Sequence, residues 1–307
     1  MIFCMMSWFM QNETVEQATG VSKSGLSFLL LMAVFAAISA ISHSRLHLLS
    51  QVTWGFTLLF GFFAVVKIIN SIASVFPNHL KMVLHWVHAM TFEILAFTSS
   101  HLLHFMKKNT APIGSGRPIL LVHGYCNDSS VWIYLRRKLA QQGLVYTVDL
   151  GNPFRSIRDY AKIVEDKVAQ IKQETGSDVL LIGHSMGGLV SLCAPFDNVA
   201  EVITLAAPLR GTHIAKVGFG PNAREMERNS TLIQELSAKI AQEKKVRFST
   251  IGTKTDQLVI PGHSALLDQS RQFLFEDIGH ASLLFSPRVA ALLTQWIYAQ
   301  VHSNFGR

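Results

Sequence analysis

The chain has 307 residues, enough for one large domain and an appendage. Charged residues make up only 15% and the mean hydropathy is +0.30, which is apolar for a soluble enzyme, and the apolar excess lies in the first third. The formal net charge of +7 comes from scattered Lys and Arg residues, with no basic run that alternates with aromatic side chains. We therefore expect no nucleic-acid partner. Attraction to an anionic membrane surface is the simpler explanation of the positive net charge.

Two apolar stretches near the N-terminus are long enough to cross a bilayer. The first has Gly25–Ile41 as its core, and the second is Leu46–Val66; each belongs to about 21 residues without Asp, Glu, Lys or Arg. A secretory signal peptide is the alternative for the first stretch. It fits less well, because Glu13 and Glu16 oppose the single Lys23 before the stretch and the run is too long. We expect a transmembrane helical hairpin.

Residues 68–106 give a mixed signal, since Lys81–Phe105 is apolar but includes Glu93 and several histidines. We expect a helix at the membrane interface or packed in a bundle. Whether it spans the membrane stays open: two spans place the N-terminus and the C-terminal domain on one side, and three place them on opposite sides. Basic residues outside the hairpin outnumber Arg45 within it, which favours a cytoplasmic C-terminal domain. They are Lys67, Lys81, Lys107 and Lys108.

The histidines and cysteines predict neither a metal site nor a disulfide framework. His85 with His88, and His101 with His104, have the spacing of one helix face, but no Cys or carboxylate cluster completes a metal site. The cysteines make no spacing motif, so we expect free thiols. They are Cys4, Cys126 and Cys193.

A linker is predicted over 110–117, which contains Pro112, Gly114 and Gly116, and strands then alternate with helices from Pro118 onward. This alternation predicts a parallel α/β sheet with helices on both faces and a site at the carboxyl ends of the strands. The predicted strands are Pro118–His123, Leu144–Leu150, Val179–His184, Val202–Ala206, Arg247–Gly252 and Gln272–Glu276, and the predicted helices are Ser130–Gln142, Ser156–Thr175, one from Met186, Asn222–Glu243 and Pro287–His302.

Gly183–Gly188 reads Gly-His-Ser-Met-Gly-Gly and directly follows the apolar run Asp178–Ile182. This is the G-x-S-x-G pattern of a nucleophile elbow, in which a buried strand turns sharply into a helix and presents a serine hydroxyl. Gly183 and Gly187 flank the turn because a Cβ there would collide with the neighbouring strand or helix. A chance match is the alternative, but the strand before and the helix after favour Ser185 as a nucleophile.

A serine nucleophile needs a base and an orienting carboxylate, which follow an elbow in the order carboxylate, then histidine. Asp256 stands beyond a predicted strand end and is the candidate carboxylate, with an ordinary turn residue as the alternative. His280 lies between the last predicted strand and the last predicted helix and is the candidate base, with a solvent-facing loop histidine as the alternative. Residues that fit less well are Asp268, Glu276, Asp277, His263 and His302.

The oxyanion formed during acyl transfer needs two N–H donors. The amide of Met186, directly after the nucleophile, is one candidate. The other is the amide of Tyr125 after the first strand, where Gly124 leaves the backbone free to aim it; an ordinary strand-end turn is the alternative.

Four segments together resemble the α/β-hydrolase superfamily: Leu-Val-His-Gly-Tyr, the elbow, Gly-Thr-Lys-Thr-Asp-Gln-Leu-Val and Ile-Gly-His-Ala-Ser-Leu-Leu-Phe-Ser. Over residues 117–300 the chain is most similar to small bacterial triacylglycerol lipases and to the GPI-inositol-deacylase-like group. The resemblance implies Ser185, Asp256 and His280 as a catalytic triad and the amides of Tyr125 and Met186 as the oxyanion hole. It also implies that Thr204–Pro208 and Gly211–Thr212 shape the acyl pocket. The N-terminal region departs from the small secreted lipases.

The predicted function is a membrane-anchored serine carboxylic-ester hydrolase, a lipase or esterase that acts through an acyl-enzyme and needs no cofactor or metal. About 40 residues separate the fourth and fifth predicted strands, too few for a large cap, so we expect an open or lightly lidded pocket. An acyltransferase or thioesterase of the same fold, and a non-catalytic membrane scaffold, are the alternatives. The sequence does not indicate the head group, the acyl length or the oligomeric state.

Overall fold

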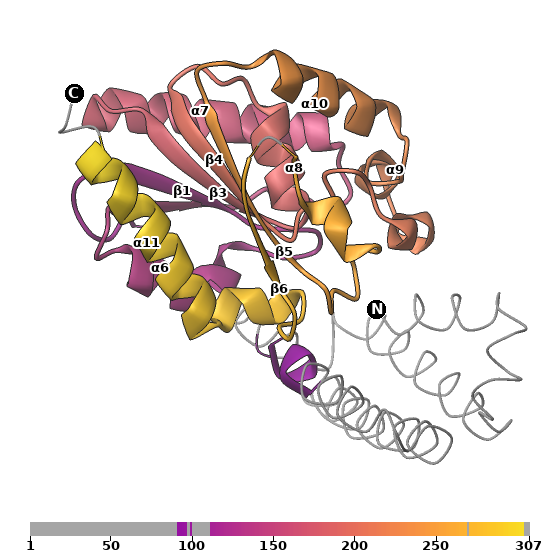
Figure 1. Cartoon of the computed structure of the whole chain (residues 1–307). Helices are drawn as coiled ribbons and strands as arrows, with labels where there is room; N and C mark the ends of the chain where they lie inside the picture. The colour runs from indigo at the N-terminus through magenta and orange to yellow at the C-terminus, as the bar shows by residue number, and fades with distance from the viewer. Residues whose placement is uncertain (1–90, 97–98, 100–110, 269, 304–307) are drawn as a thin grey trace, which may run out of the picture. The chain divides into compact units, whose positions relative to one another are not determined.

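The computed structural model describes residues 91–96, 99, 111–268 and 270–303 (Figure 1). Both predicted membrane spans lie outside these residues. Among the helices that are described, none combines the length and the hydrophobicity that a membrane span requires. The chain divides into two compact units, Met1–Val87 and His88–Arg307, and the second unit contains all of the described residues.

Six parallel strands form one sheet in the order β2-β1-β3-β4-β5-β6. The predicted parallel α/β sheet is confirmed, and the ends of most strands lie within one or two residues of those predicted. The strands are β1 (Pro118–Val122), β2 (Leu144–Val148), β3 (Val179–His184), β4 (Val199–Leu205), β5 (Arg247–Thr253) and β6 (Arg271–Phe275). All residues of β1 and β3 are buried, as expected for central strands covered on both faces.

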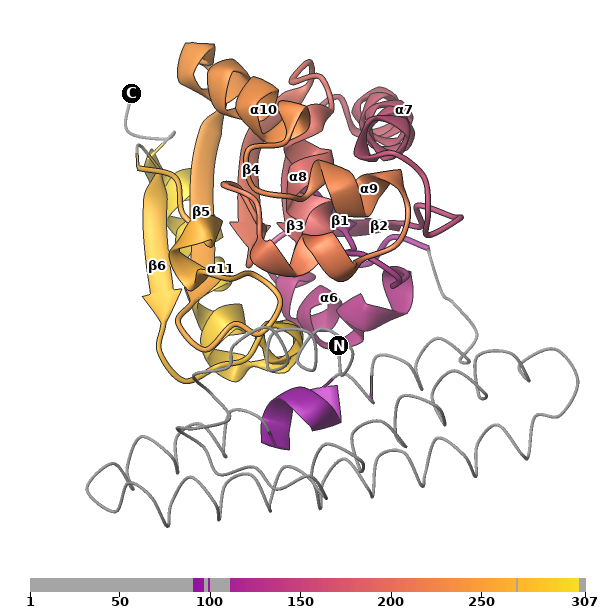
Figure 2. The ribbon, with the colours of Figure 1, turned by 90° about the vertical axis from the view of Figure 1, so that its right-hand side faces the viewer.

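Helices cover both faces of the sheet, as predicted. On one face α7 (Ile157–Thr175), α8 (Met186–Cys193) and α10 (Thr231–Gln242) share a buried apolar cluster with the strands, and on the other face α6 (Ile133–Leu139) and α11 (Pro287–Ser303) share a second cluster (Figures 1 and 2). A further helix is α9 (Pro221–Glu225), residues 91–96 are also helical, and the 3-10 turns of the described residues are η2 (Ser129–Trp132), η3 (His213–Val217), η4 (Gly262–Ala265) and η5 (Ala281–Phe285).

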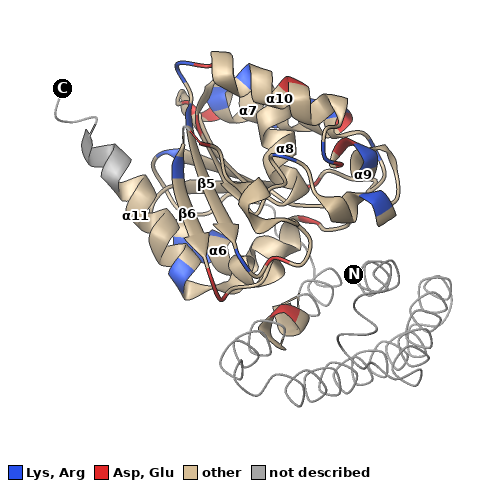
Figure 3. Ribbon diagram, turned by 45° about the vertical axis from the view of Figure 1, so that its right-hand side comes forward, with Lys and Arg blue, Asp and Glu red and all other residues tan. Residues whose placement is uncertain are grey.

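Local sequence explains the ends of α7. The Ser156 hydroxyl accepts the N–H of Arg158 at the N-terminus, and Gly176 adopts φ 69° at the C-terminus, a left-handed conformation that glycine adopts without steric cost. Ile157, Val164 and Ile171 repeat at seven-residue spacing and are buried against the sheet. Acidic and basic residues both occur along α7, α9 and α10 (Figure 3).

Two predicted helices have different bounds in the structure. The stretch predicted over Asn222–Glu243 is two helices, because Asn229 has φ 63° and the Ser230 hydroxyl caps α10 by accepting the N–H of Ile233. The helix predicted over Ser130–Gln142 begins as the 3-10 turn η2, where the Asp128 carboxylate accepts the N–H of Ser130. The first difference results from a cap inside a pattern that reads as continuously helical.

The predicted linker over 110–117 contacts the sheet. Ile113 forms an antiparallel bridge with Val145 of β2, with N–H···O distances of 3.2 and 2.8 Å. Gly114, at φ 93°, would place a Cβ 2.2 Å from the carbonyl oxygen of Gly143, so only glycine fits there. This part of the linker is therefore held against the hydrolase sheet.

Candidate active site

Ser185 lies at the sharp turn between β3 and α8, with φ 55° and ψ −128°. A non-glycine residue in this region is strained by about 1–3 kcal/mol, and such strain is a feature of functional turns. A Cβ on Gly183 would lie 2.4 Å from the carbonyl oxygen of Gly187, and a Cβ on Gly187 would lie 2.2 Å from that of Val122. The two flanking glycines are therefore required by close backbone packing, which is the reason the sequence suggested.

The structure brings Asp256 and His280 together. Asp256 follows β5, and its Oδ2 accepts a hydrogen bond from Nδ1–H of His280 at 2.9 Å. The other carboxylate oxygen accepts the N–H groups of Leu258 at 2.8 Å and Val259 at 2.7 Å. Both side chains are almost fully buried, at 0% and 3% exposure. The carboxylate is therefore fixed by backbone donors. Because Nδ1–H is bonded to Asp256, Nε2 is the ring nitrogen that can accept a proton from the nucleophile.

The charge state of His280 is set by opposing effects. Burial lowers its pKa, but the Asp256 carboxylate and the hydrogen bond to it raise the pKa, and Glu93 adds a further increase. The net result is a pKa above the usual value of 6.5. An imidazole of this kind is a stronger base than free histidine, because the imidazolium formed on taking a proton is stabilised.

His184 connects the elbow to the residue that bears the base. Its Nε2–H donates to the carbonyl oxygen of His280 at 3.1 Å, and the centroids of the two rings are 4.7 Å apart. Burial and the nearby His280 hold the pKa of His184 well below its usual value, so this ring is neutral. Since His184 immediately precedes Ser185, the contact places Ser185 and His280 at the same edge of the sheet.

The competing carboxylates are occupied elsewhere. Asp268 pairs with Arg210 at 2.6 Å and its side chain is 86% exposed. Glu276 and Asp277, although close to His280 in sequence, pair with Lys254 and Arg288 at the surface. The described carboxylate bonded to the His280 ring is therefore the one predicted from chain order.

The loop after β1 lies against the elbow. A Cβ on Gly124 would lie 2.9 Å from Cβ of Ser185, so only glycine permits this approach. The ring of His123 fixes the loop: Nδ1–H donates to the Gly124 carbonyl oxygen at 3.0 Å, and Nε2 accepts the N–H of Leu150 at 3.0 Å. The predicted oxyanion donor Tyr125 directly follows this fixed turn.

The second predicted donor, Met186, is the first residue of α8, where a backbone N–H has no acceptor within the helix. Its side chain is buried, and its Sδ accepts Nδ2–H of Asn222 at 3.5 Å. Asn222 also donates to the carbonyl oxygen of Pro153 at 2.8 Å. The segment containing α9 is thus tied to the start of α8.

Tyr125 contacts the backbone of Phe219 and the ring of Phe154. Its hydroxyl donates to the carbonyl oxygen of Phe219 at 2.8 Å and accepts the N–H of Phe219 at 3.1 Å. The Phe154 ring contacts the Tyr125 ring edge-on, with centroids 6.4 Å apart. Phe219 is 76% exposed and Phe154 49% exposed, so these apolar rings face solvent beside the predicted oxyanion loop. Of the predicted pocket segments, Thr204–Pro208 includes the end of β4 and the turn after it, where Ala206 has φ 47°, and Gly211–Thr212 lies farther along the same loop.

Sequence reasoning assigned no role in the site to Glu93, which lies in the helical residues 91–96. Its carboxylate accepts three hydrogen bonds from the two residues that follow His280: Ala281 N–H at 2.7 Å, Ser282 N–H at 3.0 Å and the Ser282 hydroxyl at 2.9 Å. The residue is 1% exposed. The available signal was the isolated acidic residue in an apolar segment, which burial makes costly unless it is paired.

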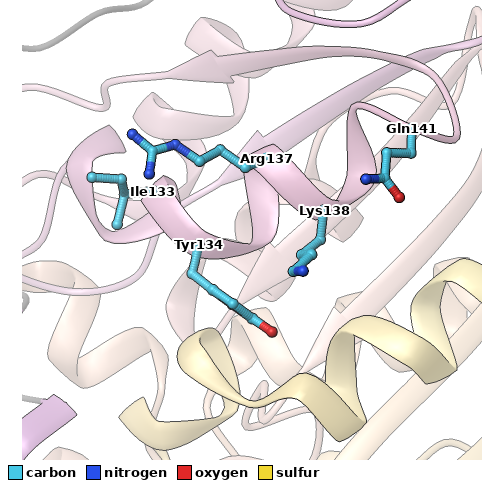
Figure 4. Close-up of a pocket in the computed structure, with 5 residues that line it drawn as sticks. All are labelled: Ile133, Tyr134, Arg137, Lys138 and Gln141. Carbon is cyan, nitrogen blue, oxygen red and sulfur yellow. The ribbon is translucent and has the colours of Figure 1, made fainter.

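Within the described part of the chain, no group of three His, Cys, Asp or Glu residues could hold a metal ion. Cys126 and Cys193 are free thiols, as predicted, and Cys4 lies outside the described residues. One surface pocket lies along α6 and the turn that follows it (Figure 4), and its lining includes none of the candidate site residues. It is lined by Ile133, Tyr134, Arg137, Lys138 and Gln141.

Several curated relatives are named as esterases. The chain is 33% identical over 101 residues to a pimeloyl-[acyl-carrier protein] methyl ester esterase of Aliivibrio salmonicida, covering 32% of this chain and 38% of the relative. It is 28% identical over 175 residues to the enzyme of that name from Nitrosospira multiformis, covering 53% of this chain and 63% of the relative. The chain thus matches less than two thirds of the length of each relative.

Solved structures of lipases share the fold. The mature Bacillus licheniformis lipase BlEst2 has a TM-score of 0.53 at 16% identity, covering 63% of this chain and 94% of that one. Aspergillus fumigatus lipase B has a TM-score of 0.54 at 15% identity, covering 95% of this chain and 84% of that one. The sequence profile of the Alpha/beta hydrolase family matches residues 119–296. The chain therefore belongs to the alpha/beta hydrolase family.

Proposed function

We propose that the chain hydrolyses carboxylic esters with Ser185 as the nucleophile, His280 as the general base and acid, and Asp256 as the residue that orients His280. The observation that carries this proposal is the buried 2.9 Å hydrogen bond between His280 and Asp256 at the edge of the sheet that bears the strained Ser185 turn. The backbone amides of Tyr125 and Met186 serve as the oxyanion donors.

The reaction has two halves. In the first, Nε2 of His280 takes the Ser185 proton while Oγ attacks the ester carbonyl carbon, and the two amides hold the resulting oxyanion. The tetrahedral species collapses, the C–O bond to the alcohol breaks, and His280 returns the proton to the departing alcohol oxygen. This leaves an acyl group on Ser185.

In the second half, His280 takes a proton from water as the water oxygen attacks the acyl carbon. The new tetrahedral species then releases the carboxylic acid, and the proton on His280 returns to Ser185 Oγ. Asp256 accepts Nδ1–H in both halves and so stabilises the imidazolium.

The proposed substrate class is an ester with an apolar acyl chain at a membrane. Phe154 and Phe219 present exposed rings beside Tyr125, which favours an alkyl chain over a charged group at that position. The apolar stretches Gly25–Ile41 and Leu46–Val66, both outside the described residues, support anchoring of the enzyme at a bilayer. Glu93 is bonded to the His280 loop, which supports two spans over three for the N-terminal region. We propose a cytoplasmic catalytic domain, because the basic residues outside the hairpin outnumber the one within it.

The test is ester hydrolysis by the full chain in detergent micelles. With p-nitrophenyl octanoate as substrate, Ser185→Ala should reduce kcat at least about 1,000-fold, because the acyl-enzyme can no longer form. Wild-type rates from Ser185→Ala would show that the assignment is wrong. Labelling of the wild type by a fluorophosphonate separates an active enzyme from a non-catalytic scaffold.

Two further substrate comparisons divide the esterase and transferase alternatives. Competition between water and glycerol for the acyl group, followed by product analysis, separates hydrolysis from acyl transfer. Comparing diacylglycerol with pimeloyl-[acyl-carrier protein] methyl ester, the substrate in the names of the curated relatives, separates a lipase from an esterase of that kind. A higher kcat/KM on the lipid ester is the expected result.

A further inference from the structure

The carboxylate of Glu93 joins the segment that precedes the sheet to the loop that carries His280. The three donors it accepts lie 188 and 189 residues away in sequence, on Ala281 and Ser282. Oε1 accepts one N–H, and Oε2 accepts one N–H and one hydroxyl. The carboxylate is thus the acceptor in all three hydrogen bonds, as an ionised carboxylate requires.

Close approach at this point depends on Gly279, the residue before His280. A Cβ on Gly279 would lie 2.2 Å from Oε2 of Glu93. Gly279, Ala281 and Ser282 therefore surround one carboxylate, and His280 is the residue enclosed between them. Glu93 therefore binds the backbone that follows the base and packs against the residue that precedes it.

Glu93 also acts on the charge of His280. The described groups that face the imidazole are Asp256, bonded to Nδ1, neutral His184, stacked at 4.7 Å between ring centroids, and Glu93. Burial raises the pKa of Glu93, and the nearby His280 and the three donors oppose that effect. Asp277, the next acidic residue along the loop, pairs with Arg288 at the surface.

Resting on the proposed ester hydrolysis, we propose that Glu93 is a positioning residue for His280. Its carboxylate binds the backbone that follows His280, packs against Gly279 before it, and supplies a second negative charge, besides Asp256, that stabilises the imidazolium formed during each turnover. The segment before the hydrolase core thus contributes to the catalytic machinery, beyond any role as an anchor.

The main variant is Glu93→Gln in the full chain, which keeps the side-chain size and removes the charge. We expect kcat on p-nitrophenyl octanoate to fall about 10- to 100-fold with KM within about twofold, because proton transfer rather than substrate binding is affected. The acidic limb of the kcat/KM profile should move to lower pH, since loss of a negative charge lowers the pKa of His280. Glu93→Asp, which keeps the charge on a shorter side chain, should restore the position of the limb.

Two matched controls separate this role from general stabilisation. Glu201 is also fully buried and accepts a hydrogen bond from Ser249 at 2.9 Å, but it lies on β4 beside Arg247 at the start of β5. Glu201→Gln should lower the melting temperature and leave the acidic limb unchanged. Glu165→Gln, at an exposed position on α7, should change neither.

An independent readout does not depend on turnover. In full chain carrying ¹³C-labelled histidine, the resonance that is missing from His280→Gln reports the His280 titration, and Glu93→Gln should lower its midpoint. An unchanged midpoint and an unchanged acidic limb in Glu93→Gln would overturn the proposal. If instead Ser185→Ala keeps wild-type activity while the midpoint still shifts, the proposed function fails and the Glu93–His280 coupling stands.

Discussion

Nδ1 of His280 lies 2.9 Å from Oδ2 of Asp256, and both side chains are almost completely shielded from solvent. Two backbone N–H groups hold the other oxygen of the same carboxylate. The orientation of the imidazole is thus determined by the loop after β5, on a different strand from the serine turn. This relationship underlies the first prediction.

Asp256→Asn should keep the fold and reduce kcat about 10³- to 10⁴-fold, because an amide in this place favours the wrong imidazole tautomer and cannot stabilise the imidazolium. The measurement is kcat on p-nitrophenyl octanoate, with circular dichroism as a check on folding. Asp268→Asn, at the exposed partner of Arg210, is the matched control and should keep kcat within about twofold. Equal effects of the two variants would contradict the role of Asp256.

The pH dependence follows from the raised pKa of His280. The base must be neutral in the free enzyme, so kcat/KM should be low in acid and rise with pH as His280 loses its proton. Because the Asp256 and Glu93 carboxylates raise that pKa, the midpoint of the rise should lie above 6.5, the value for an unperturbed imidazole. A midpoint well below 6.5 would show that burial outweighs the two carboxylates.

Gly187→Ala should prevent stable folding or cost several kcal/mol, because the new Cβ would meet backbone oxygens of Val122 and His123 at 2.2 and 2.4 Å. Gly176→Ala is the comparison: it has φ 69° but open space around the new Cβ, so it should cost only about 1–2 kcal/mol. Urea unfolding of both variants gives the two free energies. A loss at Gly187 no larger than that at Gly176 would contradict the requirement for close backbone packing at the elbow.

Phe219→Ser should reduce the preference for long acyl chains, because it removes an exposed ring next to Tyr125 that an alkyl chain can cover. We expect the ratio of kcat/KM for octanoate to that for acetate to fall about tenfold, while the acetate value stays within about twofold. Phe273→Ser, at an exposed phenylalanine on the edge strand β6, is the control and should leave the ratio unchanged. The opposite pattern would place acyl recognition elsewhere.

The sheet and the chain order of the site could be predicted because their signals are local. An apolar run followed by Gly-His-Ser-Met-Gly-Gly specifies the turn at Ser185, and Asp256 and His280 each stand just beyond a strand. The split between α9 and α10 was missed because it depends on Asn229, whose left-handed conformation interrupts a segment with helical composition.

The role of Glu93 could not be predicted from local pattern, since its contacts join residues almost two hundred positions apart. The hydrophobic pattern of its segment predicts a helix, and 91–96 is helical, but the pattern does not indicate what a single buried acid contacts. The two membrane spans, the N-terminal part of the linker and the side of the membrane stay predictions, because they concern residues outside those described.

The central claim is that Ser185 is a nucleophile activated by His280. Its most direct test is treatment of the full chain with a fluorophosphonate, followed by peptide mass spectrometry to locate the adduct. The account predicts one adduct, on the peptide that contains Ser185, formed at least about 100-fold more slowly in His280→Gln and absent in Ser185→Ala. An adduct on a different residue, or labelling of Ser185 at the same rate without His280, would contradict it.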